Sequence, residues 1–479
     1  MSQPSVTTTH GTVIGVRNGS TECFLGIPYA AAPIGELRWK APQPAFDWTG
    51  VRQATQFGPA CLQLRAPRAP ESCLADRPMS EDCLSLNIWR PTQREDGALP
   101  VMVWFHGGAF RLGGTSLEQY DGSSLGSHGV IVVTVNYRLG IFGVFPHPAL
   151  REPSANFGLL DQVAALGWVQ RNIAAFGGDP GNVTAFGESA GGASVAYLMA
   201  APAARGLFAK AIIQSGALDL PEVSRNAVAE QMVAAMQGLS LLDATAEELR
   251  SVPAAMLLQI PLPRSATMPY IDGVVVPMKM TESFRQGAFA RVPILIGTNS
   301  FEAGFFGPAW YGSVPQKMGE LWERARALTD GYGSGSDELR AAQIGTDRFA
   351  TMNTRIIASE AARHQVPVFR YYFCYVSALQ RGTLPGAIHT AEIPYVFGTL
   401  SGDTKDNTED LSVSRQIQNR WIAFARNSSP SPPGTLTWPQ YSPEGETILC
   451  IGDSGEQLIS EPRPALLDLL EQHGSFQMN

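Results

Sequence analysis

The fold is decided by one stretch of the sequence, Val183-Thr184-Ala185-Phe186-Gly187-Glu188-Ser189-Ala190-Gly191. Its first four residues have the character of a strand, and the small residues that follow, 191–201, have that of a helix. The segment between them fits G-x-S-x-G, the turn that lifts a serine onto a sharp bend between strand and helix. The serine hydroxyl then lies near a helix N-terminus, where exposed N–H groups favour negative charge. We therefore predict that Ser189 is a nucleophile.

A second match to this motif, Gly122-Ser123-Ser124-Leu125-Gly126, has a different context. Ser124 lies in a polar segment for which we predict a loop that leads into a strand. That order is the reverse of the strand, turn and helix that the chemistry requires. We therefore predict that Ser124 is not a nucleophile.

Short apolar runs alternate with helix-like segments along most of the chain. The runs are largely continuous and bounded by Gly and Pro, which is typical of strands covered on both faces. This alternation predicts an α/β fold with a mainly parallel central sheet, helices on both of its faces and a single domain over residues 1–479. The predicted strands are 101–105, 129–135, 183–186, 211–214, 292–296 and 368–372, and the predicted helices are 159–176, 191–201, 223–237 and 412–426.

Composition and charge exclude several classes of protein. The chain has 479 residues, 44% of them hydrophobic, which excludes a disordered chain and a disulfide-built mini-protein. The formal net charge is -8 and no Lys/Arg cluster occurs, so we expect no nucleic-acid partner. The longest apolar runs, such as 130–135, are far shorter than the ~20 residues of a membrane helix, so we expect no membrane span.

Residues 1–12 are polar and lack both a basic start and an apolar stretch, so we predict no export signal there. We expect a cytoplasmic protein; the alternative is a secreted or periplasmic protein whose leader has been removed.

The six cysteines lack the paired spacing of a metal site, and we expect no metal. Three of them, Cys61, Cys73 and Cys83, are close enough in sequence for one disulfide in an oxidising compartment, or they remain reduced in the cytoplasm.

A nucleophilic serine needs an imidazole base, and chain order in this architecture puts an acid next and the histidine last. Three histidines follow Ser189: His364, His389 and His473. A Gly- and Pro-bearing loop leads from a predicted strand to His389, so this side chain can reach the carboxyl edge of the sheet, and we predict it as the base. His364 belongs to a predicted helix with a solvated face, and His473 to a polar tail.

The predicted strand 292–296 leads into a polar loop that carries Glu302. A carboxylate at this position would accept the Nδ1 proton of His389, fix its tautomer and stabilise the imidazolium. The competing acid is Asp272, which sits in a Pro- and Gly-flanked turn where an aspartate commonly caps its own backbone. We predict Glu302 as the acid.

A glycine-rich loop, His106-Gly107-Gly108-Ala109-Phe110, comes directly after the predicted strand 101–105. Such a loop can aim two N–H groups at an oxyanion, and the residue after the nucleophile supplies a third. The alternative is a plain strand-ending turn. Together with Ser189, the loop indicates an oxyanion site.

Several further blocks of sequence follow one another along nearly the whole chain. They are Phe24-Leu25-Gly26-Ile27-Pro28-Tyr29-Ala30, Gly35-Glu36-Leu37-Arg38-Trp39, Ser80-Glu81-Asp82-Cys83-Leu84-Ser85-Leu86-Asn87-Ile88, Asn136-Tyr137-Arg138-Leu139-Gly140, Asn156-Phe157-Gly158-Leu159-Leu160-Asp161-Gln162, Phe176-Gly177-Gly178-Asp179-Pro180 and Trp438-Pro439-Gln440-Tyr441. In these blocks the chain resembles the type-B carboxylesterases of the α/β-hydrolase superfamily, most closely the bacterial para-nitrobenzyl esterases.

The resemblance implies an α/β-hydrolase fold and a role for each matching residue. Ser189 corresponds to the nucleophile, Glu302 to the acid and His389 to the base. The remaining correspondences are the oxyanion-hole amides of Gly108, Ala109 and Ala190, a buried acid beside the nucleophile at Glu188, and a serine that supports the triad at Ser215. Ala185 and Ala303 depart from the family pattern, which usually has a larger aliphatic residue and a glycine there.

The segment from Cys61 to Cys83 matches the family's first disulfide loop. The resemblance therefore implies a Cys61–Cys83 bond, although the extra Cys73 leaves the pairing open. The loop is short and contains no tryptophan, so we expect no choline recognition by a cation–π platform.

We predict an enzyme that hydrolyses small to medium carboxylic esters, taken as small molecules, through a covalent acyl-enzyme and without metal or organic cofactor. One alternative is a lipase that acts on longer-chain esters. The other is a non-catalytic binding scaffold, although such relatives lose the serine or histidine that this chain keeps. Phe110, Phe305 and Phe306 are predicted to line the substrate pocket by their position beside the catalytic loops, with an ordinary place in the core as the alternative.

Overall fold

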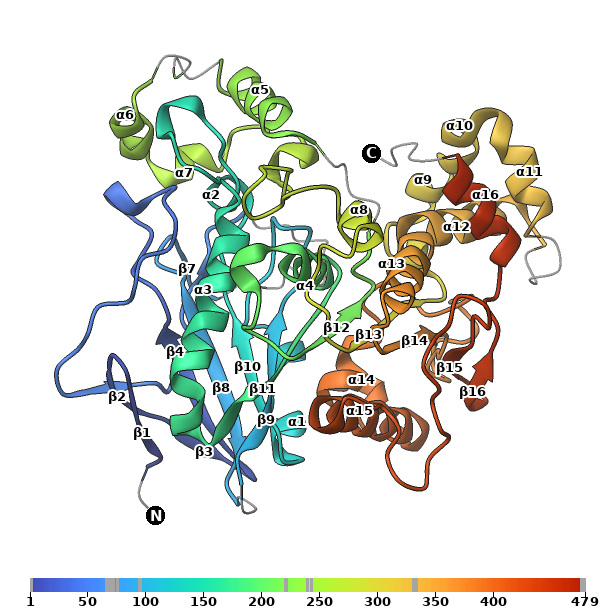
Figure 1. Cartoon of the computed structure of the whole chain (residues 1–479), viewed down its shortest axis with the longest axis horizontal. Helices are drawn as coiled ribbons and strands as arrows, with labels where there is room; N and C mark the ends of the chain where they lie inside the picture. Colours follow the sequence, from blue (N-terminus) through green and yellow to red (C-terminus); the bar gives the residue numbers. More distant parts are fainter. Residues whose placement is uncertain are drawn as a thin grey trace.

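The computed structural model describes residues 3–64, 74, 77–93, 97–218, 223–237, 241, 244–329 and 335–473. At its centre lies an 11-stranded sheet (Figure 1). The strands follow one another across the sheet in the order β16 (Gly455–Ile459), β15 (Ile448–Gly452), β14 (Val368–Phe373), β13 (Ile294–Asn299), β12 (Lys210–Gln214), β11 (Gly178–Glu188), β9 (Leu99–Phe105), β10 (Ile131–Val135), β8 (Ser85–Pro91), β4 (Thr21–Pro28) and β3 (Val16–Asn18).

The middle of the sheet is parallel and its two edges are antiparallel. All neighbouring strands from β10 across to β15 pair in parallel. β8, β4 and β3 continue the sheet antiparallel on one side, and β16 on the other. Each of the six predicted strands is present, and the prediction of a mainly parallel sheet is confirmed.

Strand β8 was missed by the pattern of apolar runs, although it is buried along its whole length. Its sequence carries polar residues that find partners inside the protein. Asn87 Nδ2 donates to the hydroxyls of Thr115 and Thr134 at 2.9 Å each, and Arg90 forms an ion pair with Glu22 of β4 at 2.7 Å. Because these partners come from other segments, the strand is buried without an apolar run to identify it.

Each face of the sheet is covered by its own apolar cluster. Val101 and Val103 of β9 pack with α3 (Phe157–Asn172) and α4 (Ala190–Ala200), whereas Met102 and Trp104 pack with the residues of α14 (Ile393–Phe397) and α15 (Thr408–Asn427). Figure 1 shows the same arrangement. Since successive side chains of a strand point to opposite faces, a strand covered on both faces is apolar throughout. The predicted helices on both faces are confirmed, and the single domain stays a prediction.

The predicted helices differ from the observed ones mainly at their ends. α3 stops at Asn172 and is followed by a 3₁₀ turn, Ile173–Phe176, before Gly177 takes a φ of 90°. α4 begins at Ala190, and the helix predicted over 223–237 is α5 (Arg225–Met236). α15 begins four residues earlier than predicted, because Asn407 caps it by accepting from the N–H groups of Glu409 and Asp410.

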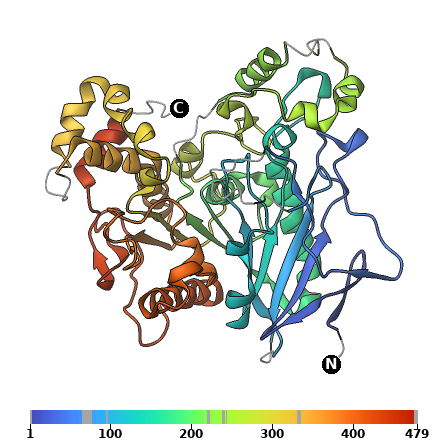
Figure 2. The ribbon, with the colours of Figure 1, turned by 180° about the vertical axis from the view of Figure 1, so that it is seen from behind.

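Further helices surround the carboxyl edge of the sheet. Figures 1 and 2 both show α9 to α12 gathered with α16, where an apolar cluster joins Val314, Ile344 and Leu466. Within the described ranges, none of the helices combines the length and apolar character that crossing a membrane requires. The remaining elements are β1 (Ser5–Thr8), β2 (Gly11–Ile14), β5 (Val51–Gln53), β6 (Ala60–Cys61), β7 (Met79–Ser80), α1 (Ser123–Ser127), α2 (Gly140–Gly143), α6 (Ala246–Ser251), α7 (Ala254–Leu257), α8 (Met280–Arg285), α9 (Pro308–Tyr311), α10 (Val314–Met318), α11 (Trp322–Ala327), α12 (Asp337–Thr346), α13 (Met352–Arg363) and α16 (Pro464–Gln472).

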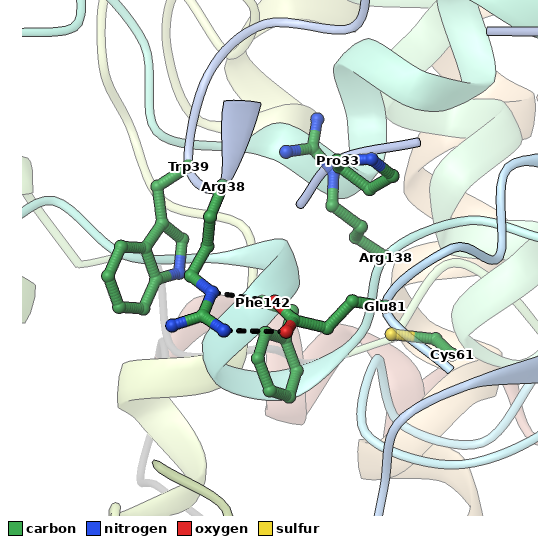
Figure 3. A pocket seen from close by; sticks show the side chains of 7 residues that line it. All are labelled: Pro33, Arg38, Trp39, Cys61, Glu81, Arg138 and Phe142. Atoms are coloured by element: carbon green, nitrogen blue, oxygen red, sulfur yellow. Dashed lines mark hydrogen bonds and ion pairs between the residues drawn. The ribbon is translucent and has the colours of Figure 1, made fainter. Parts of the chain in front are cut away.

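Two ion pairs, one of them fully buried, join sequence blocks that carry the family resemblance. Arg38 Nε and Nη2 donate to both carboxylate oxygens of Glu81 at 2.7 and 2.6 Å. Both side chains line the pocket shown in Figure 3, together with Trp39, Arg138 and Phe142. Arg138 donates in the same two-pronged way to Asp161, with Nη2–Oδ1 at 2.7 Å and Nε–Oδ2 at 2.8 Å. These motif residues therefore serve the packing of distant segments.

We expect Asp161→Ala to lower the free energy of unfolding by about 3–5 kcal/mol, because it leaves the guanidinium of Arg138 buried without its carboxylate. Urea denaturation followed by circular dichroism measures this change. The control is Asp337→Ala, which removes an exposed carboxylate from its ion pairs with Arg326 and Arg340 and should leave the curve nearly unchanged. Equal effects of the two substitutions would contradict a structural role for the buried pair.

Candidate active site

Ser189 stands on the turn between β11 and α4 with an unusual backbone conformation, φ 55° and ψ −122°. The turn is tight because glycines flank it. A Cβ at Gly191 would lie 1.9 Å from the carbonyl oxygen of Phe105, and one at Gly187 would lie 2.5 Å from the carbonyl carbon of Gly191. Only residues without a side chain allow β9, β11 and α4 to approach so closely.

The structure brings Ser189, His389 and Glu302 together in one chain of hydrogen bonds. Ser189 Oγ lies 2.7 Å from His389 Nε2, and Glu302 Oε2 lies 2.6 Å from His389 Nδ1. A carboxylate can only accept, so Nδ1 carries the ring proton and Nε2 is left to accept from the serine hydroxyl. All three side chains are buried.

The loops that carry Glu302 and His389 are paired with each other. Phe301 and Ile388 form an isolated parallel bridge, in which Phe301 N donates to Ala387 O at 2.8 Å. Asn299 Nδ2 adds a hydrogen bond to the carbonyl of Ile388 at 2.9 Å. The carboxylate and the imidazole are therefore positioned by one shared backbone contact.

The second oxygen of Glu302 is held by two donors. Ser215 Oγ donates to Oε1 at 2.6 Å, and the backbone N–H of Asn299 donates to the same oxygen at 2.7 Å. Ser215 follows β12 directly and has a positive φ of 44°. These bonds orient the carboxylate so that its other oxygen, Oε2, faces His389. Ser215 thus contacts the acid of the triad, as the resemblance implies.

Glu188, the last residue of β11, is a second buried carboxylate next to the imidazole. Its Oε1 lies 3.3 Å from His389 Nε2. A carboxylate at this distance attracts the positive charge that the ring carries once it has taken a proton. The resemblance to a buried acid beside the nucleophile thus agrees with where the side chain lies.

A third buried carboxylate, Glu392, was missed by the sequence analysis. It accepts from Asn299 Nδ2 at 2.6 Å and from Gln214 Nε2 at 3.1 Å. Burial raises the pKa of this carboxyl, and the nearby charge of Glu302 raises it further. The sequence contains one sign that Glu392 belongs to the site: it is an acid three residues after His389 and directly before the apolar α14.

The glycine-rich loop after β9 passes directly beside Ser189. A Cβ at Gly107 would lie 3.2 Å from the Cβ of Ser189. Gly108, Ala109 and Phe110 have consecutive positive φ angles of 105°, 55° and 57°. The amides of Gly108 and Ala109 donate to none of the residues that the structure describes, and Ala190 begins α4, so its N–H has no partner within the helix.

Three phenyl rings surround the imidazole of His389. The ring centroids of Phe305, Phe306 and Phe349 lie 5.6, 6.2 and 5.4 Å from that of His389. Phe349 was missed by the sequence analysis because it sits in a π-helical turn, Asp347–Thr351, that interrupts an otherwise helical pattern. Phe110 lies in the main apolar cluster of the protein, the alternative place predicted for it.

The competing residues of the sequence analysis lie elsewhere. Asp272 Oδ1 accepts from the N–H groups of Val274, Val275 and Val276, so this side chain caps its own turn. His364 follows the last residue of α13, and its half-buried ring contacts the carbonyl of Arg285. His473 is exposed and follows Gln472, the last residue of α16.

Ser124 lies in the short helix α1, so the loop predicted there is wrong. Its hydroxyl accepts from Gln418 Nε2 at 2.9 Å, because α15 packs over this part of the sheet. This second G-x-S-x-G motif therefore lies before a strand, β10, and not between a strand and the helix that follows it.

Cys61 and Cys83 are buried and free, so the disulfide that the resemblance implied is absent. A hydrogen bond between the two thiols, together with burial, raises the pKa of Cys83. Cys73 lies outside the described residues. The pocket in Figure 3 includes Cys61 among its lining residues.

Comparisons with known proteins show the family of this chain. The model of the carboxylesterase family matches residues 2–468. Para-nitrobenzyl esterase of Bacillus subtilis (strain 168) is 36% identical over 492 residues, which cover 96% of this chain and 97% of that protein. Fumonisin B1 esterase of Sphingopyxis macrogoltabida is 35% identical over 501 residues, covering 96% and 88%.

Solved structures of similar proteins share the fold. A PNB esterase superposes with a TM-score of 0.84 at 35% identity, over 98% of this chain and 100% of its own. A thermophilic PNB esterase superposes with a TM-score of 0.85 over the same shares. The chain therefore belongs to the carboxylesterase family, has the α/β-hydrolase fold and is a serine carboxylesterase that hydrolyses carboxylic esters.

Proposed function

We propose that this carboxylesterase acts on small to medium carboxylic esters through a triad of Ser189, His389 and Glu302. The observation that carries the proposal is the unbroken chain of hydrogen bonds from Ser189 Oγ through the imidazole to Glu302, with lengths of 2.7 and 2.6 Å. This geometry lets a proton leave the hydroxyl for the ring while the carboxylate stabilises the resulting imidazolium.

Hydrolysis proceeds in two halves with His389 moving the proton in each. Ser189 Oγ attacks the carbonyl carbon while Nε2 takes its proton, and the ring then gives that proton to the leaving alcohol. A water molecule attacks the acyl-enzyme with the same nitrogen as its base. The mechanism calls for no metal or organic cofactor.

The developing oxyanion is stabilised by the amides of Gly108, Ala109 and Ala190. Two observations support this assignment: the loop runs beside Ser189, and its amides are not used within the described part of the fold. Amides that are already oriented lose no energy by reorganising when the charge develops. Each donor contributes about 3 kcal/mol to the transition state.

The phenyl rings of Phe305, Phe306 and Phe349 form the apolar wall next to His389. Leu218, Ala350 and Trp310 pack with Phe306 and Phe349 in an apolar cluster separate from the main core. A wall of large rigid rings limits the length of the group that fits beside the reacting carbonyl. This arrangement favours small to medium esters, including the aryl esters that suit aromatic contacts.

Ser189→Ala should abolish the burst of nitrophenol that accompanies acylation by nitrophenyl acetate, and lower kcat by roughly 10⁴-fold or more. Rapid-mixing absorbance measures both. Ser124→Ala is the matched control, since Ser124 fits the same motif but lies in α1, and it should leave the burst and the rate unchanged. A burst retained in Ser189→Ala would overturn the proposed nucleophile.

Ser215→Ala should lower kcat for the same substrate about tenfold or more with little change in KM, because Glu302 loses a hydrogen bond to its charged oxygen. Steady-state kinetics separate the two constants, and Ser215→Thr, which keeps a hydroxyl, should restore part of the rate. Ser283→Ala, at a buried serine of α8, is the control. An equal loss in both alanine variants would argue for a general effect of packing.

A series of nitrophenyl esters from acetyl to palmitoyl tests the proposed substrate class. We expect kcat/KM to fall beyond about six acyl carbons, by roughly tenfold for each methylene that the site cannot hold. Phe349→Ala should raise kcat/KM for the longer esters relative to acetate. Phe46→Ala, at a ring that is 80% exposed, should not. Activity that rises up to palmitoyl in the unchanged protein would favour the alternative of a lipase.

A further inference from the structure

Two half-buried cysteines meet at the carboxyl end of the sheet. Cys374 follows β14 directly, and Cys450 lies in β15, the neighbouring parallel strand. Their Sγ atoms are 2.7 Å apart although 76 positions separate the residues in sequence. The other described cysteines, Cys23, Cys61 and Cys83, are buried. The pair of Cys374 and Cys450 is thus more open to reagents in solution.

A glycine makes room for the two sulfur atoms. The strands pair Tyr372 with Cys450 and Phe373 with Ile451, so the position opposite Cys374 is Gly452. Positions 450 and 452 share one face of β15, because strand side chains alternate. A Cβ at Gly452 would lie 3.0 Å from the Sγ of Cys374 and 3.7 Å from that of Cys450. The absent side chain leaves the space in which the thiols meet.

The backbone already holds the two cysteines at this separation. Cys374 N donates to the carbonyl of Ile451 at 2.9 Å. Two residues further on, Val376 N donates to Oδ1 of Asp453 at 3.1 Å, which fastens the segment after β14 to the end of β15. Little movement of the main chain is therefore needed to join the sulfur atoms.

The pKa values of the two thiols are shifted in opposite directions. A hydrogen bond from the Cys374 thiol stabilises the thiolate of Cys450 and lowers the pKa of Cys450, while the same contact, together with burial, raises the pKa of Cys374. The charge of Asp453 opposes ionisation of both. Since the thiolate is the nucleophile in thiol chemistry, Cys450 is the side chain that attacks first.

We propose that Cys374 and Cys450 form a reversible disulfide when the protein meets a low-molecular-weight disulfide. The Cys450 thiolate attacks one sulfur of that reagent and forms a mixed disulfide, and the other half leaves as a thiolate. Cys374 then loses its proton and attacks Sγ of Cys450, which closes the protein disulfide and releases the second half of the reagent as a thiolate. Two protein thiols are oxidised and one small disulfide is reduced to two thiols.

The disulfide would attach the beginning of the segment that carries His389 to the neighbouring strand β15. Cys374 is the first residue after β14, and the chain runs from there to His389 before α14 begins. A link to β15 closes a long loop and restricts the unfolded chain, so oxidation stabilises the fold. The sulfur atoms take no part in the hydrogen-bonded chain of Ser189, His389 and Glu302, and the inference does not rest on the proposed mechanism.

Oxidised glutathione is the probe. The reduced native protein is incubated with it at neutral pH, the remaining thiols are alkylated, and peptides are mapped by mass spectrometry. We expect a peptide pair joined through residues 374 and 450, with alkylation lost at two of the six cysteines. Alkylation of both residues to the level of the untreated protein, or glutathione held at Cys450 without the joined peptides, would overturn the proposal.

Three variants make the test specific. Cys374→Ser should accumulate the mixed disulfide at Cys450, because no second thiol resolves it, whereas Cys450→Ser should take up little glutathione at Cys374. Gly452→Ala should slow formation of the joined peptides, since its new methyl group displaces the Cys374 thiol. Joined peptides that form as fast in Gly452→Ala as in the unchanged protein would contradict the geometry.

Thermal unfolding supplies a second readout that does not depend on the variants being equally stable. Oxidation of the unchanged protein should raise the unfolding midpoint by about 4 °C or more, and subsequent reduction should reverse the shift. In each serine variant the same treatment should leave that variant's own midpoint unchanged. A rise in the serine variants as well would assign the stabilisation to other cysteines and overturn the proposal.

Discussion

The close contact of three backbones at Gly187 and Gly191 is the constraint on which the rest of the site depends. It places Ser189 on the turn with a φ of 55°, a conformation that an L-residue rarely adopts and that costs about 1–3 kcal/mol. Surrounding bonds offset this cost, since Ser189 N donates to Gln214 O at 2.9 Å and Ala193 N donates to Ser189 O at 2.8 Å. The hydroxyl is thereby directed out of the sheet toward the imidazole.

The parallel centre of the sheet brings the other site residues to the same edge. Ser189, Ser215 and Glu302 follow the carboxyl ends of β11, β12 and β13, which are neighbours, and His389 comes from the segment after β14. Parallel strands end at one edge, so four segments distant in sequence meet there. The bridge between Phe301 and Ile388 then brings acid and base into register, and the cysteine pair lies where the β14 segment leaves the sheet.

The sequence predicts those parts of the fold and the site that depend on neighbouring residues, and it does not predict those that depend on contacts between distant segments. The parallel strands were predictable because burial on both faces makes them apolar. Strand β8 was not, because it contains Asn87 and Arg90, which form hydrogen bonds inside the protein. Ser189 and Glu302 closely follow such strands and could be found. Glu392 and Phe349 could not, because their contacts with the site arise from an internal amide network and a π-helical turn. Proximity in sequence pointed to Cys61, Cys73 and Cys83, while the sulfur atoms of Cys374 and Cys450, 76 positions apart, lie 2.7 Å from each other.

The sequence by itself determined the turn between strand and helix, the glycine-rich loop before it and the family to which the chain belongs. These features depend on local sterics, and glycine at a close approach leaves a direct mark in the sequence. Only the tertiary structure decided that Ser189 meets His389 across 200 positions and that His389 meets Glu302 across 87, at 2.7 and 2.6 Å. Hydrogen bonds of this kind depend on the angle and distance between separate loops, which are set by the packing of the whole sheet.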